Sequence, residues 1–414
     1  MDSLKDIDKT YYMYQGTVNV LEAVHSEVVQ DANCEPLQQI KAKIADFLCM
    51  KNVNFLFGSG TSSGAIPTMS GLMQEIESEI QLLEDEKDNN KKELFQKIKN
   101  KSGNNIEEIL GVLYCKENYL AGVGDTDSSE YITCHSLISI IEDNIKKAVS
   151  AKPNGKVLDI YKNFYQKISV RNKDLARLNV FTTNNDLFNE VALDELNIHY
   201  IDGFTGGLKR YFNPSVFNCT LSKKMDTSIE RFEPLENMVY LYKIHGSVNW
   251  VEDSNSNSYF TIRSLPTCAD KGAAALIYPT PLKQNKSLGS PYVDLFREFQ
   301  HKLLEPNSVL FVIGYSFSDE HVNDVIYRAL ATNTTFNLVI INYLSEDKPI
   351  CKINDNRVFR IYSELKDGEG EGAPIHYFSR IVEELLPTLD YHAEERNSLD
   401  ELTNFIKNNL KNKS

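Results

Sequence analysis

The feature that most constrains the fold is a series of short apolar runs separated by helical stretches. The runs lie at residues 53–57, 179–183, 197–201, 239–246, 274–279, 308–314 and 336–342. Between several of them, apolar residues recur at the spacing of one helix face. This alternation predicts an α/β protein with a mostly parallel, doubly wound sheet.

A long helical region interrupts the series of runs. Residues 84–175 are charge-rich and show helical spacing, as in "HSLISIIEDNIKKAV". We interpret this region as a helical insertion whose charged faces are solvated rather than built for binding. Further amphipathic stretches occur at residues 36–50, 381–386 and 399–410.

Charge and hydropathy argue against two classes of partner, although local basic patches remain open. The 414-residue chain has a net charge of −14, so sequence-independent binding to nucleic acid phosphates is not expected. No apolar run approaches the ~20 residues that span a bilayer, and the N-terminal residues lack the pattern of a secretory signal. We therefore expect a cytoplasmic protein with no membrane contact.

The cysteines argue against a structural metal. All seven are scattered, and none forms a C-x-x-C pair. Structural zinc sites need clustered Cys or His ligands, so the sequence predicts reduced thiols and no zinc.

A glycine-rich stretch, "FLFGSGTSSGAIP" at residues 55–67, follows the first apolar run. A strand that leads through such a loop into a helix lets the backbone approach a pyrophosphate. The dinucleotide fingerprint G-x-G-x-x-G is not met, because Ser63 holds its third glycine position and Gly64 comes one residue late. Taken alone, the stretch indicates a plain connector as strongly as a nucleotide loop.

Polar residues follow three later apolar runs, where ligands bind in doubly wound folds. The residues are Thr182, Thr183, Asn184 and Asp186 after the first run, His245 after the second, and Gly314, Ser316, Ser318 and Asp319 after the third. Each also has an ordinary structural interpretation. Asn184, Asp186 and Asp319 could cap helices, and His245 could be a hydrogen-bonded core histidine.

Five motifs together resemble sirtuin-like proteins. They are "GSGTSSGAIP", "FTTNNDL", "LYKIHGS", "VIGYSFSDEHV" and "VIIN", and they span Phe55 to Asn342 in the family's order. The chain is most similar to the bacterial branch that cleaves NAD in anti-phage defence, in particular to the sirtuin-like subunit that works with a HerA-type ATPase. The resemblance implies a Rossmann-like NAD domain with a smaller helical module.

The expected organisation combines this resemblance with the pattern of the runs. It consists of an N-terminal helical segment at 1–52, a Rossmann-like NAD-binding core at 53–83 and 176–345, the helical insertion at 84–175, and a C-terminal extension with helices at 346–414.

The resemblance also implies roles for single residues. Asn184 and His245 match the catalytic positions, with His245 as the base. The NAD-binding positions are matched by Gly58, Ser59, Gly60, Thr61, Ser62, Pro67, Thr183, Asp186, Gly314, Ser316 and Asn342. The chain departs from deacylating sirtuins in a loop one residue shorter, in Ala65 at a glycine position, in a missing Asp-Phe-Arg run, and in Asn185 at an aromatic position.

The segment after His245 discriminates between functions. Deacylating sirtuins carry the first cysteine pair of a zinc ribbon there, whereas this chain has "VNWVEDSNSNSYF". We therefore expect water as the acceptor and an NAD hydrolase that serves as an anti-phage effector by NAD depletion. The alternatives are a catalytically silent sensor of NAD or ADP-ribose and, third, a protein deacylase.

An unrestrained NAD hydrolase would harm its own cell, so we expect its activity to depend on oligomerisation or on a partner. The resemblance predicts self-association and a HerA-type ATPase partner. Candidate contacts are Ile381, Leu385, Leu386, Leu402 and Ile406, which could equally belong to the core.

Overall fold

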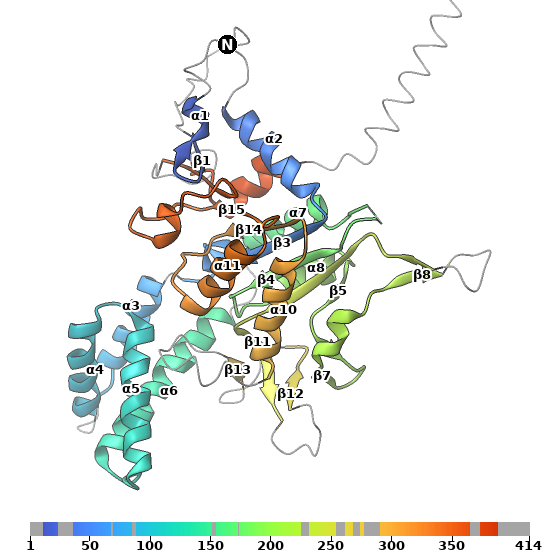
Figure 1. The fold of residues 1–414 in the computed structure, drawn as a ribbon. Coiled ribbons are helices and arrows are strands. Elements are labelled where there is room, and N and C mark those ends of the chain that lie inside the picture. Colours follow the sequence, from blue (N-terminus) through green and yellow to red (C-terminus); the bar gives the residue numbers. More distant parts are fainter. Residues whose placement is uncertain are drawn as a thin grey trace, which may run out of the picture.

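The computed structural model describes residues 11–23, 36–67, 69–84, 88–150, 155–172, 174–224, 232–253, 261–267, 274–276, 290–364 and 373–387. In this part of the chain the largest element is a nine-stranded sheet with the order β2-β1-β16-β15-β14-β3-β4-β10-β5 (Figure 1). The prediction of a mostly parallel α/β sheet is confirmed.

Seven neighbouring strands of this sheet run parallel. They are β16 (Val358–Ser363), β15 (Asn337–Ile341), β14 (Ser308–Ile313), β3 (Asn52–Phe57), β4 (Leu178–Thr182), β10 (Met238–Lys243) and β5 (His199–Ile201). Every residue of β3, β4 and β14 is buried. Helices cover one face of the sheet, and helices together with a second sheet cover the other. Because both faces of these strands are buried, their sequences are nearly continuous apolar runs.

Helices and short turns cover the first face of the sheet. This layer comprises α2 (Pro36–Leu48), α7 (Gly155–Ile168), α8 (Phe188–Glu195), α12 (Phe378–Arg380) and the helical turn Ile381–Leu385. The apolar residues of α7 recur at the spacing of one helix face, from Val157 through Tyr161 and Phe164 to Ile168, so this face packs on the sheet.

The second face carries α10 (Tyr292–Leu304), α11 (Glu320–Thr332) and a smaller sheet of order β13-β11-β12-β7-β6. The smaller sheet contains β6 (Phe204–Thr205), β7 (Arg210–Phe212), β11 (Gly246–Glu252), β12 (Ile262–Ser264) and β13 (Ala274–Leu276). The run at 274–279 therefore enters this antiparallel sheet through β13, and its residues 277–279 lie outside the described residues. A short apolar run has the same pattern in either kind of sheet.

Four helices form a module with its own core. They are α3 (Met69–Gln81), α4 (Asp88–Ser102), α5 (Ile106–Gly122) and α6 (Ser129–Val149), and they project to one side of the sheet (Figure 1). The expected boundaries of the insertion differ from this arrangement. The expected core range 53–83 contains α3, which packs in the module. The expected insertion 84–175 contains α7, which packs on the sheet. Among the described helices, none is both long and apolar enough to cross a membrane.

Strands from both ends of the chain extend the sheet beyond the expected core. β1 (Tyr11–Gln15) pairs antiparallel with β16, and β2 (Val18–Asn19) pairs with β1. The segment 1–52 was expected to be helical, but its described residues also contain these strands. β1 carries three tyrosines, and Tyr12 and Tyr14 stack on Tyr362 of β16, which favours this pairing.

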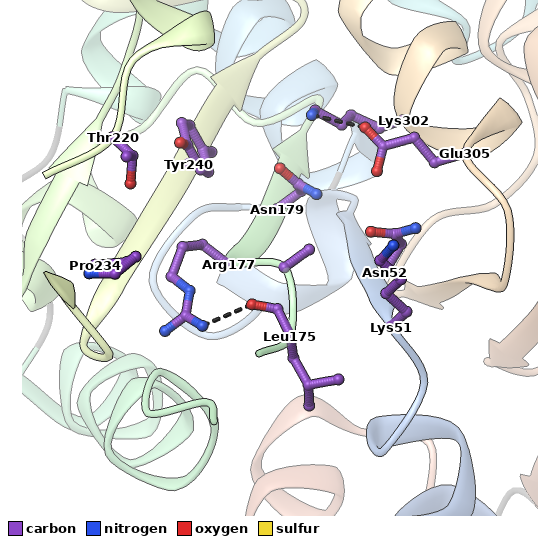
Figure 2. Close-up of a pocket in the computed structure, with 11 residues that line it drawn as sticks. Lys51, Asn52, Leu175, Arg177, Asn179, Thr220, Pro234, Tyr240, Lys302 and Glu305 are labelled. Carbon is purple, nitrogen blue, oxygen red and sulfur yellow. Dashed lines mark hydrogen bonds and ion pairs between the residues drawn. The ribbon is translucent and has the colours of Figure 1, made fainter. Parts of the chain in front are cut away.

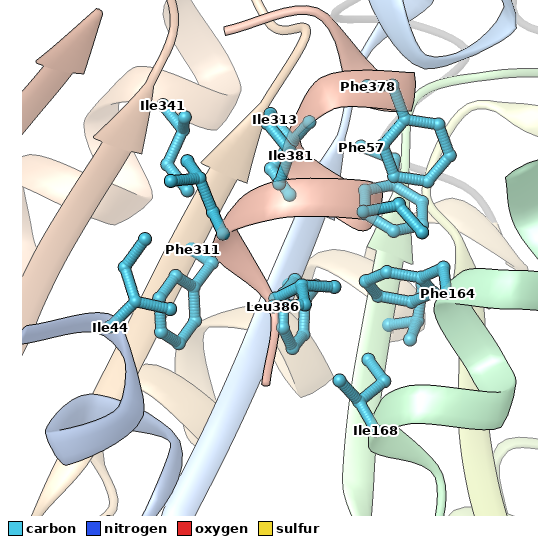
Figure 3. Packing of buried hydrophobic residues seen from close by; sticks show 14 of the residues in the cluster. Ile44, Phe57, Phe164, Ile168, Phe311, Ile313, Ile341, Phe378, Ile381 and Leu386 are labelled. Carbon is cyan, nitrogen blue, oxygen red and sulfur yellow. The ribbon is translucent and has the colours of Figure 1, made fainter. Parts of the chain in front are cut away.

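The predicted C-terminal contacts can now be assigned in part. Ile381, Leu385 and Leu386 are 0%, 1% and 3% exposed, so they belong to the core of this chain and not to a free surface. Figure 3 shows Ile381 and Leu386 packed among Phe57, Phe164 and Phe311. Leu402 and Ile406 lie outside the described residues.

A buried histidine lies near the C-terminal turn. His376 is 7% exposed and stacks on Tyr343, and its Nδ1 has no hydrogen-bond partner among the described residues. Burial disfavours the charged imidazolium and lowers the pKa of His376 from 6.5 to about 4.

We predict that His376 destabilises the protein between these two values of pH. Below about pH 6.5 His376 binds a proton in the unfolded chain, whereas in the folded chain it stays neutral until about pH 4. The free energy of unfolding therefore falls as the pH drops through this window, by up to about 3 kcal/mol. H376F, which keeps an aromatic ring against Tyr343, should remove this part of the acid loss.

Chemical denaturation of both proteins at about pH 7 and about pH 4.5 measures the effect. H301F serves as the control variant because His301 is exposed, and it should show the same acid loss as the wild type. Equal acid losses in wild type and H376F would contradict the prediction.

Candidate active site

The sheet reverses its strand order between β3 and β14. From β3 the chain builds β4, β5 and β10 on one side, and then β14, β15 and β16 on the other. A crevice forms at such a reversal, outside the carboxyl ends of the strands, and it is the usual ligand site of doubly wound folds. Gly58 follows β3 and Gly314 follows β14, so both glycine-containing turns lie at this point.

The two turns touch through their backbones. Gly58 N donates to Ile313 O at 3.0 Å, and Gly60 N donates to Gly314 O at 2.9 Å. A Cβ on Gly58 would lie 2.5 Å from Gly314 O, and one on Gly60 would lie 2.7 Å from Gly314 Cα. The glycines are therefore required for contact between the two turns, whatever ligand lies above them.

A buried polar network lies beneath the glycine-rich loop. Asn184 Nδ2 lies within 3.0–3.2 Å of Gly58 O, Thr61 Oγ1 and Ser62 Oγ. Ser62 Oγ donates to Asp186 Oδ2 at 2.8 Å, and both loop hydroxyls contact the Tyr161 hydroxyl, at 2.7 and 3.1 Å. Asn184 is thus more than a local cap, because it connects the loop after β3 to the loop after β4.

The oxygen of the Asn184 amide differs from its nitrogen. The nitrogen donates to the glycine-rich loop, whereas none of the hydrogen bonds among the described residues uses Oδ1. Asn184 is 8% exposed. An amide oxygen fixed in this way can accept a hydrogen bond from a water molecule or a sugar hydroxyl.

Buried charges support the network from below. Lys243 Nζ, 2.8 Å from Glu190 Oε1 and from Ser247 Oγ, also donates to the carbonyl oxygen of Asp186. Burial raises the pKa of Asp186 and that of Glu190, although the nearby Lys243 ammonium acts in the opposite direction. One ammonium thus compensates two buried carboxyls and fixes the start of α8.

His245 lies beside the Asn184 loop and pairs with a residue from the far side of the crevice. Thr182 and Lys243 are register partners, so Asn184 and His245 each follow two residues later on neighbouring strands. His245 Nε2 lies 3.2 Å from Asp319 Oδ2, and these side chains are 13% and 7% exposed. Asp319 follows β14, and β3 and β4 separate β14 from β10, so this pair bridges the carboxyl ends of both intervening strands.

Asp319 has a second task. Its Oδ1 accepts from the backbone N–H groups of His321 and Val322, at 2.9 and 3.4 Å, and so caps α11 as expected. The carboxylate is therefore fixed by a helix while it faces His245. A carboxylate at Nε2 favours the tautomer with hydrogen on Nε2 and leaves Nδ1 as a proton acceptor. The pair has the chemistry of an oriented general base.

The remaining predicted site residues line the same edge of the sheet. Thr183 donates from N and from Oγ1 to Phe57 O, at 3.0 and 3.3 Å. Ser316 Oγ and Ser318 Oγ lie 3.0 Å apart, and Asn342 Nδ2 donates to Tyr315 O at 3.0 Å. Ser59 and Gly60 are exposed at the loop surface, and Pro67 is half-buried at its end.

Sequence reasoning missed four members of this site. Tyr161 comes from α7, and its apolar helix pattern gave no sign of a polar role. Lys243 and Glu190 occur at ordinary strand and helix positions. Asp319 was expected only as a cap, and nothing in the chain order indicates that it meets His245.

The described residues contain no group of three or more His, Cys, Asp and Glu side chains that could hold a metal ion. Five cysteines lie within these ranges, and all of them are free thiols. The expected absence of zinc stays a prediction.

Comparison with known proteins finds one family that matches part of this chain. The SIR2-like domain family matches residues 178–363, a segment that contains Asn184, His245, Gly314, Asp319 and Asn342. The resemblance to sirtuins is thereby confirmed for this segment, whereas the anti-phage branch stays a prediction. A search of curated proteins finds no match to the chain.

Solved Sir2 structures show a low overall similarity. A mutant Sir2 homologue in complex with ADP-ribose is 13% identical, with 86% of this chain and 98% of that chain covered and a TM-score of 0.37. A Sir2 homologue in complex with NAD is 11% identical, with 88% and 96% covered and a TM-score of 0.37.

The contact between the turns predicts unequal costs for two glycine substitutions. Gly314 and Gly103 both have positive φ, +64° and +59°, but an added Cβ would meet Thr61 N at 2.7 Å in the first and nothing within 4 Å in the second. G103A should cost about 1 kcal/mol of stability through backbone strain alone. G314A should cost about 3 kcal/mol or more, because the loop must also move. Thermal denaturation compares them, and equal costs would exclude the tight contact.

Proposed function

We propose that the chain cleaves NAD into nicotinamide and ADP-ribose. The observation that carries this proposal is the His245–Asp319 pair, which lies at the same carboxyl edge of the sheet as the Asn184 amide and the glycine-rich loop. The match of residues 178–363 to the SIR2-like domain supports it, because that segment holds both proposed catalytic residues.

Each part of the crevice suits one part of the substrate. The exposed turn at Ser59 and Gly60 would lie against the pyrophosphate, with Gly314 and Ser316 on the other side. Asn342 directly follows β15, which is the neighbour of β14 in the sheet, and it would hold the adenosine ribose. Ser62 belongs to the loop at the phosphates. Thr183 and Asp186 would support the ribose next to nicotinamide, and Asn184 Oδ1 would accept a hydrogen bond from that ribose or from water.

The reaction breaks the N-glycosidic bond of NAD. Its electron pair leaves with nicotinamide, while positive charge develops on the ribose in an oxocarbenium-like transition state. Water adds to the ribose carbon as His245 accepts its proton. Asp319 stabilises the resulting imidazolium and acts as a positioning residue, since it does not itself touch the reacting atoms.

The first test is the release of nicotinamide by the purified protein. Free nicotinamide without any peptide supports hydrolysis, nicotinamide release only with an acyl-lysine peptide would indicate a deacylase, and NAD binding without cleavage would indicate a sensor. The last two outcomes contradict the proposal.

We predict that H245A reduces NAD cleavage by about 100-fold or more, the loss typical of a positioned acid–base group. D319N should reduce it by about 10- to 100-fold, because Asn still caps a helix but has no charge to orient the imidazole. Thermal denaturation should show little change in either variant. Near-normal cleavage by H245A with unchanged melting would contradict the mechanism.

Asn184→Ala serves as a contrasting variant. The Asn184 amide joins two loops, so its loss should lower activity and also cost about 1–3 kcal/mol of stability. The His245 and Asp319 variants therefore separate catalysis from folding, whereas Asn184→Ala combines the two.

We further propose that the activity serves bacterial anti-phage defence by NAD depletion, in an assembly of several copies with a HerA-type ATPase. Unrestrained NAD cleavage would harm the producing cell, so activity should depend on assembly. Size measurement in solution, with cleavage assayed for the protein alone and with the ATPase, tests this arrangement. A strictly monomeric protein that is fully active alone would contradict it.

We also predict that the purified protein holds no stoichiometric zinc. The sequence lacks paired cysteines, which a zinc ribbon of the deacylating kind requires. Elemental analysis measures the zinc content. One tightly held zinc per chain would contradict the prediction and support the deacylase alternative.

A further inference from the structure

A second polar cavity lies at the opposite edge of the large sheet. It has a volume of about 400 Å³, within the range of small-molecule sites. The cavity is formed at the amino ends of β3, β4 and β10 and near the end of α10 (Figure 2). Its lining consists of Lys51, Asn52, Leu175, Ala176, Arg177, Asn179, Thr220, Pro234, Tyr240, Lys302 and Glu305.

The lining is positively charged in an acidic protein. It contains three cationic side chains, Lys51, Arg177 and Lys302, against one acidic side chain, Glu305, whereas the whole chain carries −14. Lys302 Nζ lies 2.9 Å from Glu305 Oε1, and these side chains are 19% and 25% exposed. An anion that entered the cavity would therefore meet a net positive field.

Arg177 makes this charge a fixed part of the wall. Its guanidinium donates to the carbonyl oxygens of Arg171, Leu235, Glu236, Asn172 and Leu175, at 2.6–3.2 Å. Carbonyl groups satisfy the hydrogen bonds without cancelling the formal charge. The guanidinium of Arg171 lies close behind, and burial, together with repulsion by Arg177, lowers the pKa of Arg171 to about 10.

The rest of the lining offers a flat surface and hydrogen-bonding groups. Tyr240 supplies an aromatic ring that is held by a 2.7 Å bond from its hydroxyl to Cys219 O, and Leu175 and Pro234 add apolar surface. Asn179 is 3% exposed, and its Nδ2 donates to Asn54 Oδ1 at 2.9 Å. Figure 2 shows the Asn179 amide between the Lys302–Glu305 pair and Arg177.

We propose that this cavity binds a small organic anion that carries a flat ring and a phosphate group, of the class of nucleoside monophosphates. The ring would lie against Tyr240 and the apolar wall, and the phosphate would lie between Lys51 and Lys302. This site is separate from the crevice at the carboxyl edge and does not depend on NAD cleavage.

The positions of the two sites allow both to be occupied at once. β3, β4 and β10 each contribute residues to the cavity at their amino ends and to the crevice at their carboxyl ends. A strand of six residues spans about 20 Å, so ligands at the two ends would not collide.

Calorimetric titration with uridine monophosphate tests the proposal, since this probe lacks the adenine of NAD. We expect saturable binding with one ligand per chain, weaker binding of uridine, which has no charge, and weaker binding of inorganic phosphate, which has no ring. The double variant K51Q/K302Q should weaken uridine monophosphate binding by about 10-fold or more. E305Q should strengthen it several-fold, because it frees Lys302 from its carboxylate partner.

A matched control makes the same change of charge elsewhere. K101Q/K147Q alters two exposed lysines of the helical module and should bind uridine monophosphate as the wild type does. Thermal denaturation checks that every variant is folded. Absence of saturable binding to the wild type, equal affinity for uridine, or unchanged affinity in both K51Q/K302Q and E305Q would overturn the proposal.

Discussion

The close contact between the turn after β3 and the turn after β14 is the constraint on which the site depends. These strands are neighbours where the strand order reverses, and their turns meet without any side chain between them. Three glycines make this approach possible, Gly58 and Gly60 on one side and Gly314 on the other. Once the turns are fixed, Thr61 and Ser62 point into the protein, where Asn184, Asp186 and Tyr161 bind them. The loop is thus held from below by buried hydrogen bonds and exposed above at Ser59 and Gly60, which suits a loop that lies against a ligand.

The two sides of the site have different roles. On the side of α7 and α8, buried charges and hydroxyls hold the loops and are shielded from solvent. On the side of α10 and α11, His245 and Asp319 form a pair across the carboxyl ends of β3 and β4. The first side explains why Asn184 and Asp186 matter for folding, and the second side offers the chemistry of a base. Asp319 belongs to both tasks, since one carboxylate oxygen caps a helix and the other faces the imidazole.

Much of this arrangement could be predicted from sequence, for reasons that differ between elements. The buried strands β3, β4 and β14 are apolar at nearly every position, so their runs were visible, and the polar residues after them marked the functional edge. The boundary of the helical module was not visible, because α3 and α7 have the same kind of amphipathic pattern but bury it in different cores. The pairing of β1 with β16 joins positions about 350 residues apart, which no local pattern encodes. The His245–Asp319 pair was missed for the same reason, since it depends on how two distant loops meet.

The long-range pairing of the sheet has a consequence for how the chain folds during its synthesis. β3 is buried on both sides by β4 and β14, and the latter begins 256 residues after β3, with Asn52 opposite Ser308. The pairing of β1 with β16 joins residues that are still farther apart in the chain, since Tyr11 lies opposite Ser363. The helical module between them makes its contacts locally and has a separate core, so it can form while the sheet is incomplete. One side of β3 therefore stays unpaired until β14 has been made, and one side of β1 stays unpaired until β16 has been made.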